Sequence, residues 1–323
     1  TANGLTSNID ASTATSTLGQ TLTVGTGALG TPTLTSASPV SQLVIGPSTG
    51  SAVGTFNFKA TTGAATITKL GFTLAEDSLT NAITSITVGG VTKTVAVGAT
   101  TTISGLSIAV PVTNAGTDVP VTVSYNTVGV GGIASAASTT LVVGSVEYQS
   151  GNTTATNYVY VPANKMTVVA AYPTIAVAVG SSNNLVNGVA KLADITVTAV
   201  GNKVKITTIG VTVATTGVLL NSAILQLKDG NTQVASTTAV ADDGANDLEF
   251  NDGGYILTAG QSKTFSLYGT VTEGDGTGNS VVTQLGAAAA LDWYDVEGDS
   301  VVLHADLIPS YSLTNSYTLV SAN

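Results

Sequence analysis

Acidic side chains are the most numerous residues of this sequence that could do chemistry. Most of them fall in three groups in the second half of the chain, namely Asp242, Asp243, Asp247, Glu249 and Asp252, then Glu273 and Asp275, and last Asp292, Asp295, Glu297 and Asp299. Carboxylates in loops bind Ca²⁺, and carboxylate pairs hydrolyse glycosides. None of the groups has the spacing of an EF-hand. We therefore expect no metal site and interpret these acids as solvated turn residues. The alternative is that the loops bind Ca²⁺.

Other catalytic side chains are scarce. The chain has one His, no Cys and no Arg, although nucleophilic and general acid–base catalysis depend on such groups. The one histidine, His304, alternates with Asp306 in a strand-like run and is predicted to be an exposed strand residue. A glycosidase cleft needs aromatic rings, yet Trp293 is the single Trp. We predict that the chain is not an enzyme and has no catalytic or cofactor-binding residues.

One match to a nucleotide-binding pattern occurs at Gly25–Gly30, where glycines stand at positions 25, 27 and 30. The dinucleotide mechanism also needs a helix after the glycines and an acid about 20 residues later. Here Thr31 and Pro32 follow, and the next acid is Glu76. We interpret the match as a flexible turn.

The composition excludes several classes of partner. Nine Lys stand against 19 acidic residues, giving a net charge of −10, so no basic stripe exists for nucleic acid. No apolar run approaches the roughly 20 residues of a membrane span. The chain starts at Thr1 without Met, as expected of a secreted protein whose signal peptide has been removed. Asn152 begins an Asn-Thr-Thr sequon, a candidate glycosylation site in a polar loop.

An internal repeat organises these residues. Apolar positions of the segment 56–74 reappear at a constant offset of 139 in the segment 195–213, and Gly71 coincides with Gly210. Further matches pair 121–123 with 265–267, 146–148 with 291–293, and 165–169 with 316–320, while 21–24 is a weaker third copy of the last pair. The apolar residues alternate over four to eight positions, which is typical of half-buried strands.

These patterns predict an extended segment over residues 1–20 and two β-sandwich modules over 21–165 and 166–323. The charge differs sharply between the modules. Residues 1–165 hold five acids and four Lys, whereas residues 166–323 hold fourteen acids and five Lys.

The duplicated strand pair, together with the Cys-free composition rich in Thr, Val, Ala and Gly, resembles the tandem immunoglobulin-like modules of prokaryotic cell-surface proteins, in particular surface-layer proteins and fibre subunits. The resemblance implies an all-β fold of two tandem antiparallel sandwiches with very little helix. It also implies a scaffolding role at the cell surface and brings no catalytic residues.

Such a role predicts self-assembly into a filament or surface layer by strand pairing between subunits. Residues 1–35 are the candidate donor strand, with Leu18, Leu22, Val24, Leu29 and Leu34 as the side chains that would fill a neighbour's groove. In the opposing interpretation, residues 21–35 form the first strand of their own module. The alternative function is a monomeric adhesin or carbohydrate-binding module, for which the candidate platform comprises Tyr158, Tyr160, Tyr294, Tyr311 and Tyr317.

Overall fold

The structure is a computed structural model that describes residues 27–75, 81–96, 98–178, 184–220, 224–237, 244–273, 278–287, 290–297, 308, 311 and 316–321. Within these residues the chain forms strands β1–β25 and one three-residue 3₁₀ turn, η1 (Asn251–Gly253). Nearly all of the strand pairs are antiparallel. The expectation of an all-β chain with very little helix is therefore confirmed.

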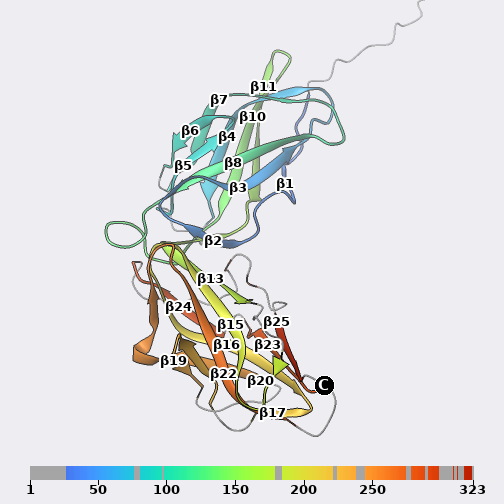
Figure 1. Cartoon of the computed structure of the whole chain (residues 1–323). Coiled ribbons are helices and arrows are strands. Elements are labelled where there is room, and N and C mark those ends of the chain that lie inside the picture. Colours follow the sequence, from blue (N-terminus) through green and yellow to red (C-terminus); the bar gives the residue numbers. More distant parts are fainter. Residues whose placement is uncertain are drawn as a thin grey trace, which may run out of the picture.

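Strands β1–β12, here called module 1, form two packed sheets and a small third sheet (Figure 1). The first has the order β1 (Thr33–Leu34), β3 (Ser48–Phe58), β8 (Thr117–Tyr125), β5 (Ile83–Val88) and β6 (Val91–Thr94). The second has the order β11 (Thr153–Pro162), β10 (Leu141–Ser150), β4 (Ala65–Leu74) and β7 (Thr101–Val110). The third consists of β2 (Gln42–Ile45), β12 (Met166–Val169) and β9 (Ala137–Thr139).

Strands β13–β25, here called module 2, form one continuous folded sheet. Its path is β13 (Ala171–Ala178), β15 (Gly188–Gly201), β22 (Ser262–Glu273), β18 (Gln226–Asp229), β19 (Thr232–Ser236), β20 (Gly244–Phe250), β16 (Val204–Thr216), β23 (Ser280–Leu285), β25 (Ser316–Ser321) and β14 (Asn184–Leu185). Off this path, β17 (Val218–Leu220) pairs with β22, while β21 (Tyr255–Leu257) and β24 (Leu291–Asp295) pair with β16.

Alternation of apolar and polar residues builds one core in each module, because successive side chains of a strand point to opposite faces. Phe56 and Phe58 of β3 are at most 1% exposed and belong to the core of module 1. Phe265 and Trp293 occupy the core of module 2 and are fully buried. The cores meet at β12, where Met166 belongs to the first and Val169 to the second.

The internal repeat is visible in the strand pairing of the two modules. Leu70 of β4 lies opposite Val146 of β10, and Ile209 of β16 lies opposite Leu291 of β24. The sequence offsets relate Leu70 to Ile209 and Val146 to Leu291, so the same pair of positions meets in both modules. The register of each pair also shifts at the equivalent place, leaving Thr68 in β4 and its copy Thr207 in β16 without a partner in the ladder.

Both bulged threonines are held in the same way. The hydroxyl of Thr68 donates to the carbonyl oxygen of Glu147 at 3.2 Å, and that of Thr207 donates to the carbonyl oxygen of Asp292 at 3.2 Å. Because a bulge re-aims the strand around it, conservation of this detail shows that the modules share their local geometry as well as their strand order.

Glycines at the matched positions 71 and 210 share a packing role. A Cβ added to Gly71 would collide with the hydroxyl oxygen of Ser145, and one added to Gly210 would collide with the Cβ of Ala290. Ser145 and Ala290 are related by the same offset of 145 residues as Val146 and Leu291. Glycine is therefore needed for a close backbone approach in both copies.

One predicted equivalence is wrong by two residues. The sequence matched Val121 with Phe265, but Phe56 pairs with Val119 while its copy Ile195 pairs with Phe265. The counterpart of Phe265 is thus Val119. A shift of two residues keeps every side chain on its original face, so alternation alone does not detect it.

The last strands of the modules are also equivalent. β12 lies parallel to β2 and antiparallel to β9, and β25 lies parallel to β14 and antiparallel to β23. This matches the predicted correspondence of 165–169 with 316–320. Because Met166–Val169 pairs within module 1, we propose that the boundary falls at Ala170, close to residue 166 expected from the sequence.

Candidate functional site

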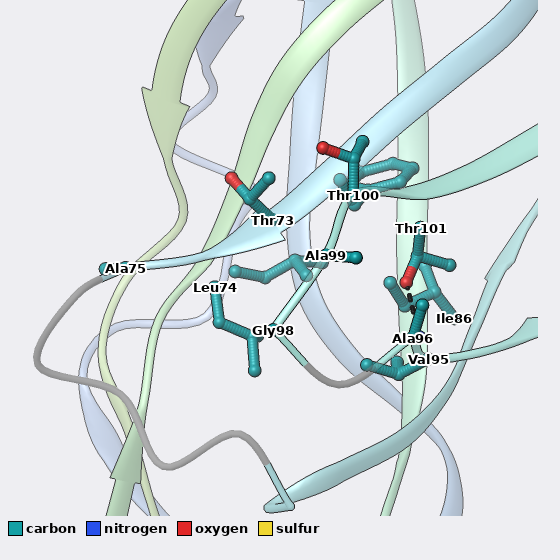
Figure 2. A pocket seen from close by; sticks show the side chains of 12 residues that line it. Thr73, Leu74, Ala75, Ile86, Val95, Ala96, Gly98, Ala99, Thr100 and Thr101 are labelled. Carbon is teal, nitrogen blue, oxygen red and sulfur yellow. Dashed lines mark hydrogen bonds between the residues drawn. The ribbon is translucent and has the colours of Figure 1, made fainter.

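A pocket opens in module 1 between the end of β4 and the segment that links β6 to β7 (Figure 2). Its volume is about 340 Å³, and its lining includes Phe72, Leu74, Ile86 and Leu141. The backbone N–H of Ala96 donates to the hydroxyl of Thr101 at 2.9 Å and shapes the rim. None of the described residues that line the pocket is ionisable, so these residues offer contact surface without acidic or basic side chains.

The described acids nominated from the sequence lie on several elements of module 2. Asp247 and Glu249 are exposed on β20, Asp252 lies in η1, and Asp292 is half-buried on β24. Among the described residues, no three His, Cys, Asp or Glu side chains are close enough to hold a metal ion. The remaining nominated groups lie outside the described residues or have undescribed side chains, namely Asp242, Asp243, Glu273, Asp275, Asp299, His304 and Asp306.

The equivalent outer faces of the modules carry different charges. In module 1, Lys69 lies opposite Glu147 and binds its carboxylate at 3.0 Å. The hydrogen bond from Lys69 lowers the pKa of Glu147 below its ordinary value. In module 2, the counterpart of Lys69 is Thr208, which stands between Glu249 and Asp292. The loss of one cation and the gain of one acid at this position account for part of the charge difference between the modules.

Asp295 has a different role from the Ca²⁺ ligand considered in the sequence. It is 1% exposed at the junction of the two modules. Its Oδ2 atom accepts hydrogen bonds from the hydroxyl of Ser135 at 2.8 Å and from the backbone N–H of Ala170 at 2.6 Å. A side chain of module 2 thus binds a loop of module 1 and the boundary residue together.

Further contacts surround this carboxylate. A Cβ at Gly129 in module 1 would collide with the carbonyl oxygen of Glu297 in module 2. A Cβ at Gly201 would collide with the carbonyl oxygen of Ala170 and lie 2.9 Å from the side chain of Ile45. Since these approaches leave no room for larger residues, the modules are packed tightly against each other at the junction.

Apolar side chains of module 1 complete the junction. All four residues of β12 are buried, although a strand with one face on its own core would bury only alternate residues. Val169 is fully buried and Leu43 of β2 is 3% exposed, and both belong to the core of module 2. The outward face of the small sheet therefore serves as a docking face for the next module.

The junction repeats a contact at the opposite end of module 1. The backbone N–H of Gly27 donates to the hydroxyl of Ser150 at 2.7 Å, and Ser150 is the counterpart of Asp295 at the offset of 145 residues. Ser150 also donates to the carbonyl oxygen of Ala64 at 3.0 Å. The first residues of each module are thus tied to the end of the same framework strand.

The five tyrosines do not form one platform. Tyr158 and Tyr160 are 87% and 69% exposed on one face of β11. The ring of Tyr294 lies under Lys205, the hydroxyl of Tyr311 donates to the carbonyl oxygen of Gly286 at 2.8 Å, and Tyr317 is buried. The structure therefore leaves a pair of exposed rings rather than the predicted set of five.

Leu29 and Leu34 belong to their own module. Leu29 bridges to Ala60 and is 5% exposed, and Leu34 of β1 pairs with Phe56. This corrects their assignment as donor side chains and supports the opposing interpretation for residues 27–35. Leu18, Leu22 and Val24 lie outside the described residues. The described part of the glycine motif, residues 27–30, forms an isolated β-bridge at Leu29 rather than the predicted turn.

Two further expectations concern the surface. Asn152 is exposed in the tight turn between β10 and β11, which is the loop position expected for the sequon. No helix in the described part of the chain has the length and apolar character needed to cross a bilayer.

Comparison with known proteins gives matches among solved structures alone. No family model matches the chain, and no curated protein matches it. The C-terminal domain of the Streptococcus agalactiae AgI/II polypeptide BspA is 12% identical, with a TM-score of 0.20 over 90% of this chain and 99% of that one. The collagen adhesin of S. aureus is 11% identical, with a TM-score of 0.21 over 93% and 94%.

A third match, the T6 backbone pilin of Streptococcus pyogenes, is 11% identical, with a TM-score of 0.20 over 80% of this chain and 61% of that one. The names of two of these matches describe an adhesin and a backbone pilin. TM-scores near 0.2 are too low to carry an argument, so the function proposed below rests on this chain's own residues.

Proposed function

We propose that this chain is a structural subunit of an extracellular homopolymer, a filament or a surface layer, in which subunits join head to tail by strand pairing. The observation that carries the proposal is the end-to-end arrangement of the modules. The described chain enters module 1 at the end remote from module 2, and β25 ends at the far end of module 2 (Figure 1). A contact between opposite ends of two copies is heterologous and gives an open filament.

The packed junction suits this role. Asp295, Ser135 and Ala170 connect the modules through buried hydrogen bonds, and Val169 and Leu43 share the core of module 2. A subunit held in this way transmits force along its long axis without hinging at its centre. The Cys-free, weakly charged sequence and the exposed sequon at Asn152 are compatible with a cell-surface location and with glycosylation of that side chain.

The donor-strand part of the proposal now concerns residues 1–26. Gly27 donates its backbone N–H to Ser150 at the end of module 1 where the described chain begins, here called the leading end of the module. Any strand donated by the preceding residues would start from that end. Its acceptor would be the far end of module 2 in another copy. Main-chain hydrogen bonds would supply affinity, and alternate side chains such as Leu22 and Val24 would supply specificity.

Negative-stain microscopy of the full chain and of a chain lacking residues 1–20 tests the proposal. The full chain is expected to form filaments or a periodic layer, and the shortened chain is expected to lose them while keeping its β-sheet circular dichroism spectrum. A full chain that stays monomeric at every concentration would contradict the homopolymer. Filaments of undiminished length from the shortened chain would contradict donation by that segment.

A second function, adhesion to glycans, is favoured by Tyr158 and Tyr160. Residues two apart in a strand share a face, and aromatic rings with apolar faces and polar tips suit sugar rings. Glycan binding that is lost in Tyr158→Ala and Tyr160→Ala, but retained in Tyr294→Ala, would establish this function. Absence of binding to a broad glycan panel would eliminate it.

A further inference from the structure

The last strand of module 2 exposes the face that its counterpart in module 1 buries. In β12, Thr167 is 6% exposed and Val169 is fully buried, because module 2 covers them. In β25, the counterpart Thr318 is exposed and Val320 is 42% exposed. The alternate residues Tyr317 and Leu319 are buried, at 5% and 2% exposure, and so are their counterparts Met166 and Val168 in β12.

We infer that this face of module 2, formed by Thr318 and Val320 of β25 and by Val186 after β14, is a docking surface for the leading end of module 1 in a second copy of this chain. The inference rests on the proposed function, because it assumes that copies of the chain meet end to end. It adds the surface at which they meet and the geometry of that contact.

The occupant follows from the repeat. In the junction, the equivalent face receives the leading end of module 2, where the Ala170 N–H binds Asp295. The leading end of module 1 is built in the same way, since the Gly27 N–H binds Ser150 there. An end with this framework is therefore what the exposed face of β25 is shaped to receive.

The two surfaces also match in chemistry. Val186 is 55% exposed, and the described stretches 184–190 and 316–321 contain no charged residue. The leading end of module 1 has a hollow of about 370 Å³ whose lining includes Ala64, Ala65, Val110 and Pro111, with no charged side chain. Apolar side chains entering this hollow would leave water without burying an unpaired charge.

The contact between copies is weaker than the junction within a copy. In module 1, the long connection between β8 and β9 carries Gly129 and Ser135 onto module 2. The corresponding connection from Glu273 to Ser280 is shorter. Moreover, Asp295 is replaced by the neutral Ser150 at the leading end of module 1. The predicted association is therefore reversible and depends on concentration.

Complementation between two blocked variants tests the inference. Val320→Asp places a negative charge on the docking face, and Ala64→Asp places a charge of the same sign on the exposed leading end, so the two blocked surfaces repel each other, while each variant keeps the opposite surface intact. Sedimentation velocity of the full chain should show chains of many lengths for the unmodified protein and monomers for each variant alone. An equimolar mixture should give dimers and nothing longer.

Ile256→Asp is the matched control, because Ile256 is 54% exposed on β21, away from both ends, and it should assemble as the unmodified chain does. Val186→Asp is a second block that leaves β25 itself untouched, and circular dichroism confirms that each variant folds. Normal assembly of folded Val320→Asp and Val186→Asp, or a mixture that stays monomeric, would overturn the docking surface while leaving the homopolymer intact. An unmodified chain that never assembles would overturn both.

Discussion

Replacing Asp295 should uncouple the two modules. Its carboxylate accepts hydrogen bonds from Ser135 and from the Ala170 N–H, and it is 1% exposed. Asp295→Ala would leave both donors buried without a partner. A buried group left unsatisfied costs about 1–3 kcal/mol, so the two together predict a loss of about 2–6 kcal/mol in the free energy of unfolding that is assigned to module 2 and the junction.

Asp295→Asn should have a smaller effect. The amide oxygen can still accept both hydrogen bonds. The amide nitrogen takes the place of Oδ1, which is buried without a hydrogen-bond partner, so its N–H groups stay unsatisfied at a cost of about 1–3 kcal/mol. Because Ser135 and Ala170 keep their acceptor, we expect a loss of about 1–3 kcal/mol, less than that of Asp295→Ala.

Trp293 makes the effect measurable in the intact chain. It is the single Trp and is fully buried in module 2, so its fluorescence during urea unfolding reports module 2, while far-ultraviolet circular dichroism reports both modules. In Asp295→Ala, the fluorescence transition should move to lower urea and separate from the circular dichroism transition. The position of the fluorescence midpoint measures the loss directly.

Two controls isolate the junction. Ser150→Ala removes the equivalent side chain from the leading end of module 1, where it contacts Gly27 and Ala64, so it should leave the Trp293 midpoint unchanged. Asp247→Asn removes an exposed negative charge from module 2 without touching the junction and should also leave the midpoint in place. Equal midpoints for Asp295→Ala and the unmodified chain would refute the role of the Asp295 hydrogen bonds in holding the modules together, as would equal losses of stability in the Ala and Asn variants.

Three further predictions concern the framework. Gly71→Ala and Gly210→Ala should each destabilise their own module by about 1–3 kcal/mol in urea unfolding, because the added methyl group overpacks the same contact. Tyr125→Phe should stabilise module 1 by about 1 kcal/mol in the same assay, since burial raises the pKa of Tyr125 and its hydroxyl has no hydrogen-bond partner. The stabilisation that Lys69 gives to the fold should vanish in acid. The pKa of Glu147 is lower in the folded chain than its ordinary value of 4.5, so the ion pair stabilises the fold above pH 4.5, and this stabilisation is lost as the pH falls through the pKa of the folded state.

Each of these predictions has a matched comparison. Gly144→Ala should be close to neutral, because a Cβ there meets no atom nearer than 3.6 Å; a loss equal to that of Gly71→Ala would contradict overpacking. For Tyr125, a destabilised Phe variant would show that the hydroxyl is bound after all. For the ion pair, a Lys69→Met chain should differ from the unmodified chain at neutral pH and converge with it in acid, and a constant difference across pH would disprove the titration of Glu147.

The framework could be predicted from the sequence because the repeat encodes it in side chains. Val146 was matched correctly with Leu291, and Leu70 with Ile209, since apolar residues at fixed offsets mark the same core positions, and the two pairs lie opposite each other in equivalent ladders. The error at Phe265 is a displacement of two residues along one strand, because Gly54 pairs with Val121 whereas its copy Ala193 pairs with Leu267. A displacement of two residues leaves the alternation of apolar and polar positions intact, so a pattern of period two does not detect it.

The junction could not be predicted in the same way. One donor to Asp295 is a backbone N–H, which leaves no mark on residue type, and the other is Ser135, 160 residues away. Among many acids in module 2, Asp295 looked like another loop carboxylate. The offset of 145 residues does distinguish it, because it equates Asp295 with Ser150 at the leading end of module 1. Divergence between two copies of one position is the feature that would have identified it.

That divergence also bears on the order of the modules. A carboxylate at position 295 is satisfied because module 1 precedes it and supplies the hydroxyl of Ser135, whereas Ser150 satisfies its own hydroxyl within module 1 by donating to Ala64. In a chain with the modules exchanged, Asp295 would lie at a free end and Ser150 would face the end of module 2, which lacks the long β8–β9 connection. The exchanged chain would therefore bury less surface at its junction and lose the hydrogen bonds that Asp295 accepts from Ser135 and Ala170. The two copies share a framework, but the contacts at their ends fix which of them comes first.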